Sequence, residues 1–226
     1  MPVIHITDDN FRSLPIFPLQ GLTLFPGMII PLHIFEPKYV ALLEHCLENQ
    51  HLIALANTSA NTQEHTRILD PEHDAPPVFR IMGAGIIIAA RELPKQRWNI
   101  LVQGVVRVEA LRELIVDEPF RLVEARVLLD ADIEVEQLKE QTQRLKQLLY
   151  ILCDHEELSE VVNNILASGP TPEELTHAVA AQLIVDPVQR QRVLELLSPL
   201  QRAEVLNELV GQQILERTIN DDELPN

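Results

Sequence analysis

The distribution of glycine, proline and leucine changes near residue 130, and this change constrains the fold more than any other feature. Five of the seven glycines and eleven of the sixteen prolines lie within the first 120 residues, among short apolar runs. That pattern is typical of strands joined by turns. After residue 130, Leu138, Leu145 and Leu149 follow the spacing of one helix face. We therefore predict an α+β protein with a β-rich part over 1–130 and a helical part over 131–226.

In the first part, dense apolar runs predict strands, and one helix interrupts them after Glu36-Pro37. The segment 91–97, which contains Pro94, is expected to connect two strands of a hairpin. The polar stretch 57–77 is expected to be a long loop, and such loops are commonly functional or poorly ordered. The expected strands cover 14–19, 28–34, 52–56, 78–90, 98–107 and 121–129.

In the second part, proline and capping residues separate a series of helices. Thr171-Pro172-Glu173-Glu174 forms a capping box with proline at the first helical position. Asp186-Pro187 and Ser198-Pro199 each indicate the end of one helix and the start of the next. The expected helices cover 133–154, 156–167, 172–185, 187–197 and 199–217, which together make a compact bundle.

The charge balance argues against two classes of partner. The chain has 18 Lys and Arg against 34 Asp and Glu, a net charge of −16, so we expect no nucleic acid and no anionic membrane as a ligand. Its apolar runs are shorter than the ~20 residues of a membrane-spanning helix. The N-terminal ten residues do not resemble a signal peptide. With Cys46 and Cys153 far apart in the sequence, we expect free thiols and a cytoplasmic protein.

Motifs for catalysis are absent from the 226 residues. None of the four lysines stands in a G-x-x-x-x-G-K-[ST] phosphate loop, and none of the five serines stands in a G-x-S-x-G elbow. The carboxylates Asp70, Glu72 and Asp74 alternate in the polar loop, which provides no fixed geometry for acid–base chemistry. We therefore predict that the chain is not an enzyme and uses no cofactor.

Scattered cysteine and histidine residues give one conceivable metal site. His45-Cys46 and Cys153-Asp154-His155 could supply two thiolates and two imidazoles if their helices touched. Adjacent residues on a helix point in different directions, so two buried thiols with solvated histidines is the simpler interpretation. His65 and His73 are expected to be solvated loop residues. We predict no metal site.

Several runs of the chain together resemble the N-terminal domain family of Lon proteases. They include LPIFPLQG at 14–21, LFPGM at 24–28, PLHIFEPKY at 31–39, IMGAG at 81–85 and WNILVQGVVR at 98–107. The segment 171–215 is similar to the helices that follow in Lon. The resemblance implies a β-rich, PUA-like pseudo-barrel with one helix, followed by a helical subdomain. In Lon this region contributes to substrate recognition, and similar domains occur in cereblon-type adaptors.

Two functions remain open at this stage. The first is a non-catalytic polypeptide-binding module that lacks the ATPase and peptidase domains of Lon, with unfolded or extended polypeptide as its partner. The alternative is an adaptor or assembly component that binds one dedicated folded protein. Phe79 and Trp98 are the candidate residues of a polypeptide-binding groove, because aromatic side chains give broad contact area. The run 25–28 is expected to turn one strand into the next.

Overall fold

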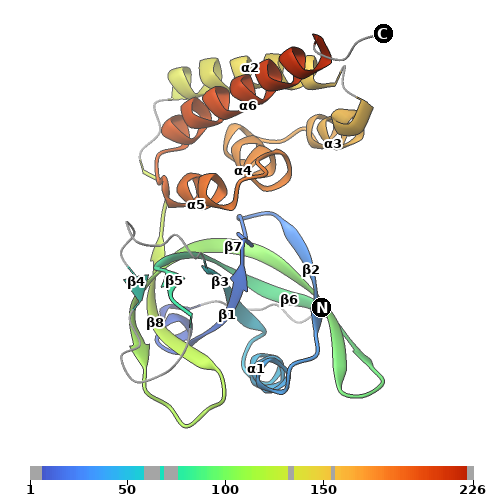
Figure 1. Ribbon diagram of the computed structural model, residues 1–226. Coiled ribbons are helices and arrows are strands. Elements are labelled where there is room, and N and C mark those ends of the chain that lie inside the picture. Colours follow the sequence, from blue (N-terminus) through green and yellow to red (C-terminus); the bar gives the residue numbers. More distant parts are fainter. Residues whose placement is uncertain (1–6, 59–66, 69–75, 132–134, 154–155, 223–226) are drawn as a thin grey trace. The chain divides into compact units, whose positions relative to one another are not determined.

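The computed structural model describes residues 7–58, 67–68, 76–131, 135–153 and 156–222 (Figure 1). The chain forms two compact units, Met1–Leu129 and Asp130–Asn226, called here the β unit and the helical unit. The first contains the strands and one α-helix, and the second contains helices. The predicted α+β class is confirmed.

Among its described residues, the β unit has a short 3-10 helix, eight strands and one α-helix. In chain order the elements are η1 (Asp8–Phe11), β1 (Leu14–Gln20), β2 (Ile29–Ile34), α1 (Pro37–Glu48), β3 (Leu52–Thr58), β4 (Arg67–Ile68), β5 (Val78–Phe79), β6 (Ile81–Leu93), β7 (Arg97–Leu114) and β8 (Arg121–Leu128).

Six of these strands form one sheet in the order β2-β7-β6-β3-β1-β8, and β8 also pairs with β7. The length of β7 makes this double pairing possible. Its first half pairs with β2 and its second half with β8, so β7, β6, β3, β1 and β8 close into a ring. Of the strand pairs in the described ranges, β1 with β3 alone is parallel. Register shifts in β6 and β7 near Gly85 and Ala89 allow the strands to coil.

The central strand β3 is buried on both faces. Ile53 and Leu55 join one apolar cluster, in which Leu42 and Leu43 of α1 also pack. Leu52, Ala54 and Ala56, which alternate with them, join a second cluster. Residues on a strand alternate between faces, so a strand buried on both is apolar throughout. The unbroken run 52–56 therefore follows from the position of β3 inside the unit.

A loop crosses the sheet at two glycines, Gly83 and Gly104. The backbone of Leu24 and Phe25 lies so close to β6 and β7 that a Cβ at Gly83 would be 1.9 Å from the Leu24 carbonyl oxygen, and one at Gly104 would be 2.2 Å from that of Phe25. The Met28 amide donates to the Phe25 carbonyl oxygen at 3.1 Å, and Gly27 has a φ of +83°. This is a turn with proline second and glycine third. The expected role of 25–28 as a turn is confirmed.

The hairpin and the polar loop differ from the sequence-based expectation. Strand β6 continues to Leu93 and β7 begins at Arg97, so the connection is shorter than 91–97. Lys95 and Gln96 adopt positive φ, which allows the tight reversal. Strand β7 also extends beyond 107 to Leu114 because it serves two partners. Most of the loop 57–77 lies outside the described residues, although β4 within it pairs with β5.

The helical unit follows the predicted division closely. Its helices are α2 (Val135–Leu152), α3 (Glu156–Ala167), α4 (Pro172–Leu183), α5 (Pro187–Glu195) and α6 (Pro199–Asp222). The capping box is present, since the Thr171 amide donates to Glu174 Oε2 at 2.8 Å and the Glu174 amide donates to Thr171 Oγ1 at 3.3 Å. The carboxylate of Asp186 accepts from the Val188 amide at 2.9 Å.

An ion pair between a buried arginine and a partly buried aspartate fixes the first residue of the helical unit. Arg202 on α6 is fully buried and donates to both carboxylate oxygens of Asp130, at 2.9 and 2.7 Å, and to the Leu196 carbonyl oxygen at 2.9 Å. Burial lowers the pKa of Arg202 to about 10, and the charge of Glu173 opposes part of this shift. The guanidinium is therefore charged at neutral pH and depends on Asp130 for compensation.

Substituting Gly83→Ala should strongly destabilise the β unit. The new methyl group would overlap the Leu24 backbone, which cannot move as a flexible side chain can. We expect a loss of about 3 kcal/mol in the free energy of unfolding, measured by guanidinium unfolding with the fluorescence of the single tryptophan, Trp98. The matched control is Gly211→Ala in α6, where a Cβ meets nothing within 4 Å. Unchanged stability in Gly83→Ala would contradict the close crossing.

Substituting Asp130→Ala should destabilise the helical unit because it leaves a buried guanidinium without its carboxylate. We expect the free energy of unfolding to fall by about 3 kcal/mol. The measurement is urea unfolding monitored by circular dichroism at 222 nm. Glu136→Ala is the control: it removes an exposed carboxylate that lies 3.5 Å from Lys139, and we expect a change within about 0.5 kcal/mol. Equal effects of the two substitutions would show that the buried pair is not needed.

Candidate functional site

The two aromatic residues predicted to line a groove lie in different places. Phe79 in β5 is only 2% exposed, so its ring is part of the interior and presents no surface to a ligand. Trp98 in β7 is partly buried against the cluster that includes Ile34 and Leu42. Phe79 precedes the start of β6, whereas Trp98 pairs with Glu92 near its end. The structure does not bring the two rings together, and their burial could not be read from residue type.

A different surface of the β unit is both apolar and exposed. In β2 the side chains of Ile29, Pro31 and His33 point outward, and Phe35 continues this alternation. Across the sheet, Leu101 lies opposite Pro31, and Ala89 of β6 lies opposite Leu101. Directly opposite residues share one face of a sheet. We call this set the β2 face: Ile29, Pro31, His33, Phe35, Ala89 and Leu101.

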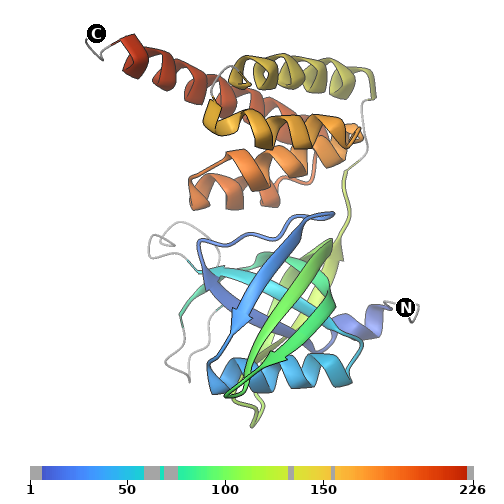
Figure 2. The ribbon, with the colours of Figure 1, turned by 90° about the vertical axis from the view of Figure 1, so that its right-hand side faces the viewer.

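The β2 face has large apolar side chains and no charged member. Phe35 is 62% exposed, Ile29 53% and Leu101 38%. The His33 ring stacks on Phe35 with centroids 5.9 Å apart, and its Nδ1 lies 2.7 Å from Asn99 Oδ1. In Figure 2, β2 is the blue strand beside the green hairpin of β6 and β7. Gln103 and Asn99 lie opposite Ile29 and His33 on the same face, and Arg91 lies opposite Asn99, so polar side chains border the apolar ones. An exposed apolar patch with a polar border is typical of a binding site.

Sequence reasoning missed this surface because both alternating sets of β2 are largely apolar, with His33 as the one polar side chain. Ile30, Leu32 and Ile34 pack against the interior, while Ile29, Pro31 and His33 are exposed. Neither set carries a charge that would mark it as the solvent side. The only available signal was the apolar Phe35 directly after the strand, at a position that continues the outward set.

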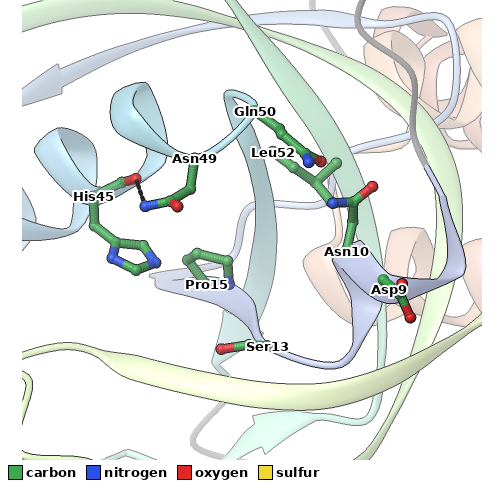
Figure 3. A pocket seen from close by; sticks show the side chains of 8 residues that line it. All are labelled: Asp9, Asn10, Ser13, Pro15, His45, Asn49, Gln50 and Leu52. Atoms are coloured by element: carbon green, nitrogen blue, oxygen red, sulfur yellow. Dashed lines mark hydrogen bonds between the residues drawn. The ribbon is translucent and has the colours of Figure 1, made fainter.

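A small polar pocket lies at the end of α1 (Figure 3). Its volume is about 230 Å³. The Asn49 side-chain amide donates to the His45 carbonyl oxygen at 2.9 Å, and the His45 ring contacts the Phe120 ring with centroids 5.1 Å apart. The lining offers amides, one hydroxyl, one imidazole and one carboxylate, which suit hydrogen bonding. It comprises Asp9, Asn10, Ser13, Pro15, His45, Asn49, Gln50 and Leu52.

The cysteines and histidines considered as metal ligands are not assembled into a site within the described ranges. No group of three or more His, Cys, Asp or Glu residues there has metal-binding geometry. Cys46 is fully buried on α1, and burial raises the pKa of its thiol to about 12. Cys153 lies in the helical unit, while Asp154, His155, His65 and His73 lie outside the described residues. A thiol as hard to ionise as Cys46 is a poor metal ligand.

In the described part of the chain, no helix combines the length and the hydropathy required to cross a bilayer.

Comparison with known families identifies the chain. Residues 13–212 match the model of the ATP-dependent protease La (LON) substrate-binding domain, which spans both the β unit and most of the helical unit. The chain belongs to this family. The resemblance seen in the sequence is thereby confirmed, and the runs that carried it form the crossing loop, β2, and the glycine-containing parts of β6 and β7.

Curated relatives of this LON substrate-binding domain are Lon proteases. That of Anaeromyxobacter dehalogenans is 26% identical over 217 residues, and that of Heliobacterium modesticaldum is 27% identical over 221 residues. Each alignment covers 94% of this chain but only 24% and 26% of the respective relative. The chain thus spans about a quarter of the length of the relatives it matches.

Solved structures share the fold of this LON domain. The N-terminal domain of Mycobacterium avium complex Lon protease matches with a TM-score of 0.67 and 15% identity, covering 88% of this chain and 98% of that one. A Lon N-terminal domain protein from Xanthomonas campestris matches with a TM-score of 0.57 and 20% identity, covering 86% and 96%. At these identities the match supports the architecture rather than particular residues.

Proposed function

We propose that this chain is a non-catalytic module that binds unfolded or extended polypeptide, and that the β2 face is its contact surface. The proposal rests on one observation: a chain of the LON substrate-binding family exposes an uncharged apolar face on β2 and β7. Many different unfolded clients share apolar side chains but no common sequence. A flat apolar face with one aromatic residue suits such clients better than a deep polar pocket does.

The chemistry of the face determines how binding should respond to salt. Its members carry no charge, so apolar burial rather than ion pairing drives the contact. We therefore expect the dissociation constant to change little between low and high salt. Affinity for one face should be weak, because a single site lacks the gain that several linked sites provide.

Substituting Phe35→Ser should weaken polypeptide binding about tenfold. Burying a phenylalanine side chain contributes about 1.5–3 kcal/mol, and 1.4 kcal/mol corresponds to a tenfold change. The measurement is fluorescence anisotropy with a labelled, reduced and unfolded model protein, titrated without nucleotide. Ile115→Ser is the matched control, since Ile115 is 82% exposed in the same unit but lies beyond the opposite end of β7.

The same titration separates the competing functions. If Phe35→Ser and Ile115→Ser lower affinity equally, the β2 face is not the binding surface. If the wild-type chain binds no unfolded protein at high concentration, the polypeptide-binding proposal fails and a dedicated folded partner becomes the better hypothesis.

We also propose that the chain is not catalytic and that it is cytoplasmic. The sequence has no phosphate loop, and the pocket beside α1 offers hydrogen-bonding groups without a metal group among the described residues. A chain of this kind would bind polypeptide without hydrolysing it or ATP. Both cysteines are free, which supports a reducing, cytoplasmic location.

A further inference from the structure

Strand β2 is an edge strand with an unusual composition. It pairs with β7 along one side, and it stands at the end of the strand order of its sheet. Edge strands of soluble proteins commonly carry charged side chains, which discourage pairing with other chains. The six residues of β2 are Ile, Ile, Pro, Leu, His and Ile, with no lysine, arginine, aspartate or glutamate among them. Such a strand needs another means of avoiding strand addition.

The hydrogen-bond pattern shows which backbone groups face away from β7. The Gly104 amide donates to the Met28 carbonyl oxygen at 2.8 Å, and these residues lie opposite each other at the start of the ladder. Bonded pairs alternate with unbonded pairs in an antiparallel ladder. Ile30, Leu32 and Ile34 therefore bond to β7, whereas the backbone groups of Ile29, Pro31 and His33 point to the free edge.

Pro31 occupies the middle of that free edge. Proline has no amide hydrogen, so the central outward donor is missing. An incoming strand would meet the Pro31 ring where it needs an N–H group. Because the backbone groups of Pro31 point to the free edge, its missing amide hydrogen removes no bond to β7. Pro31 therefore blocks the free edge at its middle without weakening the pairing of β2 with β7.

Strand β1, which lies between β3 and β8, has a second proline beyond its pairing with β8. Its residues Leu14–Ile16 pair with β8, and the rest of the strand continues past this pairing. Leu14 and Ile16 direct their backbone groups toward β8, since Pro15 between them has no donor. Pro18 lies two residues after Ile16, so its backbone faces the same side of β1, beyond the end of the pairing with β8. Its missing donor therefore lies on an unpaired part of β1. The part of β1 that β8 leaves unpaired thus also carries a proline.

We propose that Pro31 makes the β2 edge unavailable for strand addition, so that polypeptide binds to the side chains of the β2 face and not as an extra strand. This inference rests on the proposed function for its account of binding. Without Pro31, β2 would be an uncharged six-residue β segment, the composition that readily pairs with other chains. A protein that meets unfolded chains gains from a side-chain contact that cannot grow into a β-sheet.

The first test is the self-association of Pro31→Val. Valine restores the donor and favours a strand, so we expect association at least tenfold tighter than in the wild-type chain, measured by sedimentation velocity over a range of concentrations. Pro94→Val is the control, because Pro94 lies in the β6–β7 connection and not on an edge. Circular dichroism and an unfolding curve establish that each variant is folded. A folded Pro31→Val chain that associates no more than the wild type would overturn the role of Pro31.

The second test uses the wild-type chain and two labelled ten-residue peptides of alternating leucine and threonine. One carries N-methyl groups at all of its internal residues, which removes the donors on both edges that strand addition requires. Affinities within about twofold of each other support binding through side chains. A loss of tenfold or more for the methylated peptide would overturn it. If neither peptide binds, the proposed function fails, while sedimentation of Pro31→Val still decides the role of the edge.

Discussion

The close crossing of Leu24 and Phe25 over the glycines of β6 and β7 is the contact on which the β unit depends. Their carbonyl oxygens occupy space that a Cβ would fill at Gly83 and Gly104. The Gly27 amide donates to the Gly104 carbonyl oxygen at 2.9 Å, so the turn is also bonded to β7. This crossing places β2 beside β7 and leads directly to the exposed β2 face.

The sequence predicted the element types well because local rules determine them. Leucine spacing gave the long helix of the second part, and the Thr171 capping box and the prolines gave the starts of three others. The ion pair between Asp130 and Arg202 was not predictable, since 72 residues separate the partners. The glycines at 83 and 104 were visible in the sequence, but the loop they accommodate was not.

The sequence predicted the kind of side chain in the candidate site but not which residues form it. Residue type pointed to aromatic side chains, but burial separates the interior Phe79 from the exposed Phe35. Burial depends on which side of β2 faces the interior, and the sequence hides that choice because His33 is the one polar residue among the six of the strand. The crossing loop sets the register of β2 on β7 and therefore determines which set is exposed.

The most direct test of polypeptide binding at the β2 face is methyl NMR of the full chain with labelled isoleucine and leucine. An unfolded, unlabelled model protein is added stepwise. We expect the largest shift changes at Ile29 and Leu101, with Ile115 and the methyl groups of the helical unit nearly unchanged. Saturable changes confined to residues of the helical unit, with Ile29 and Leu101 unaffected, would contradict the assignment of the binding surface.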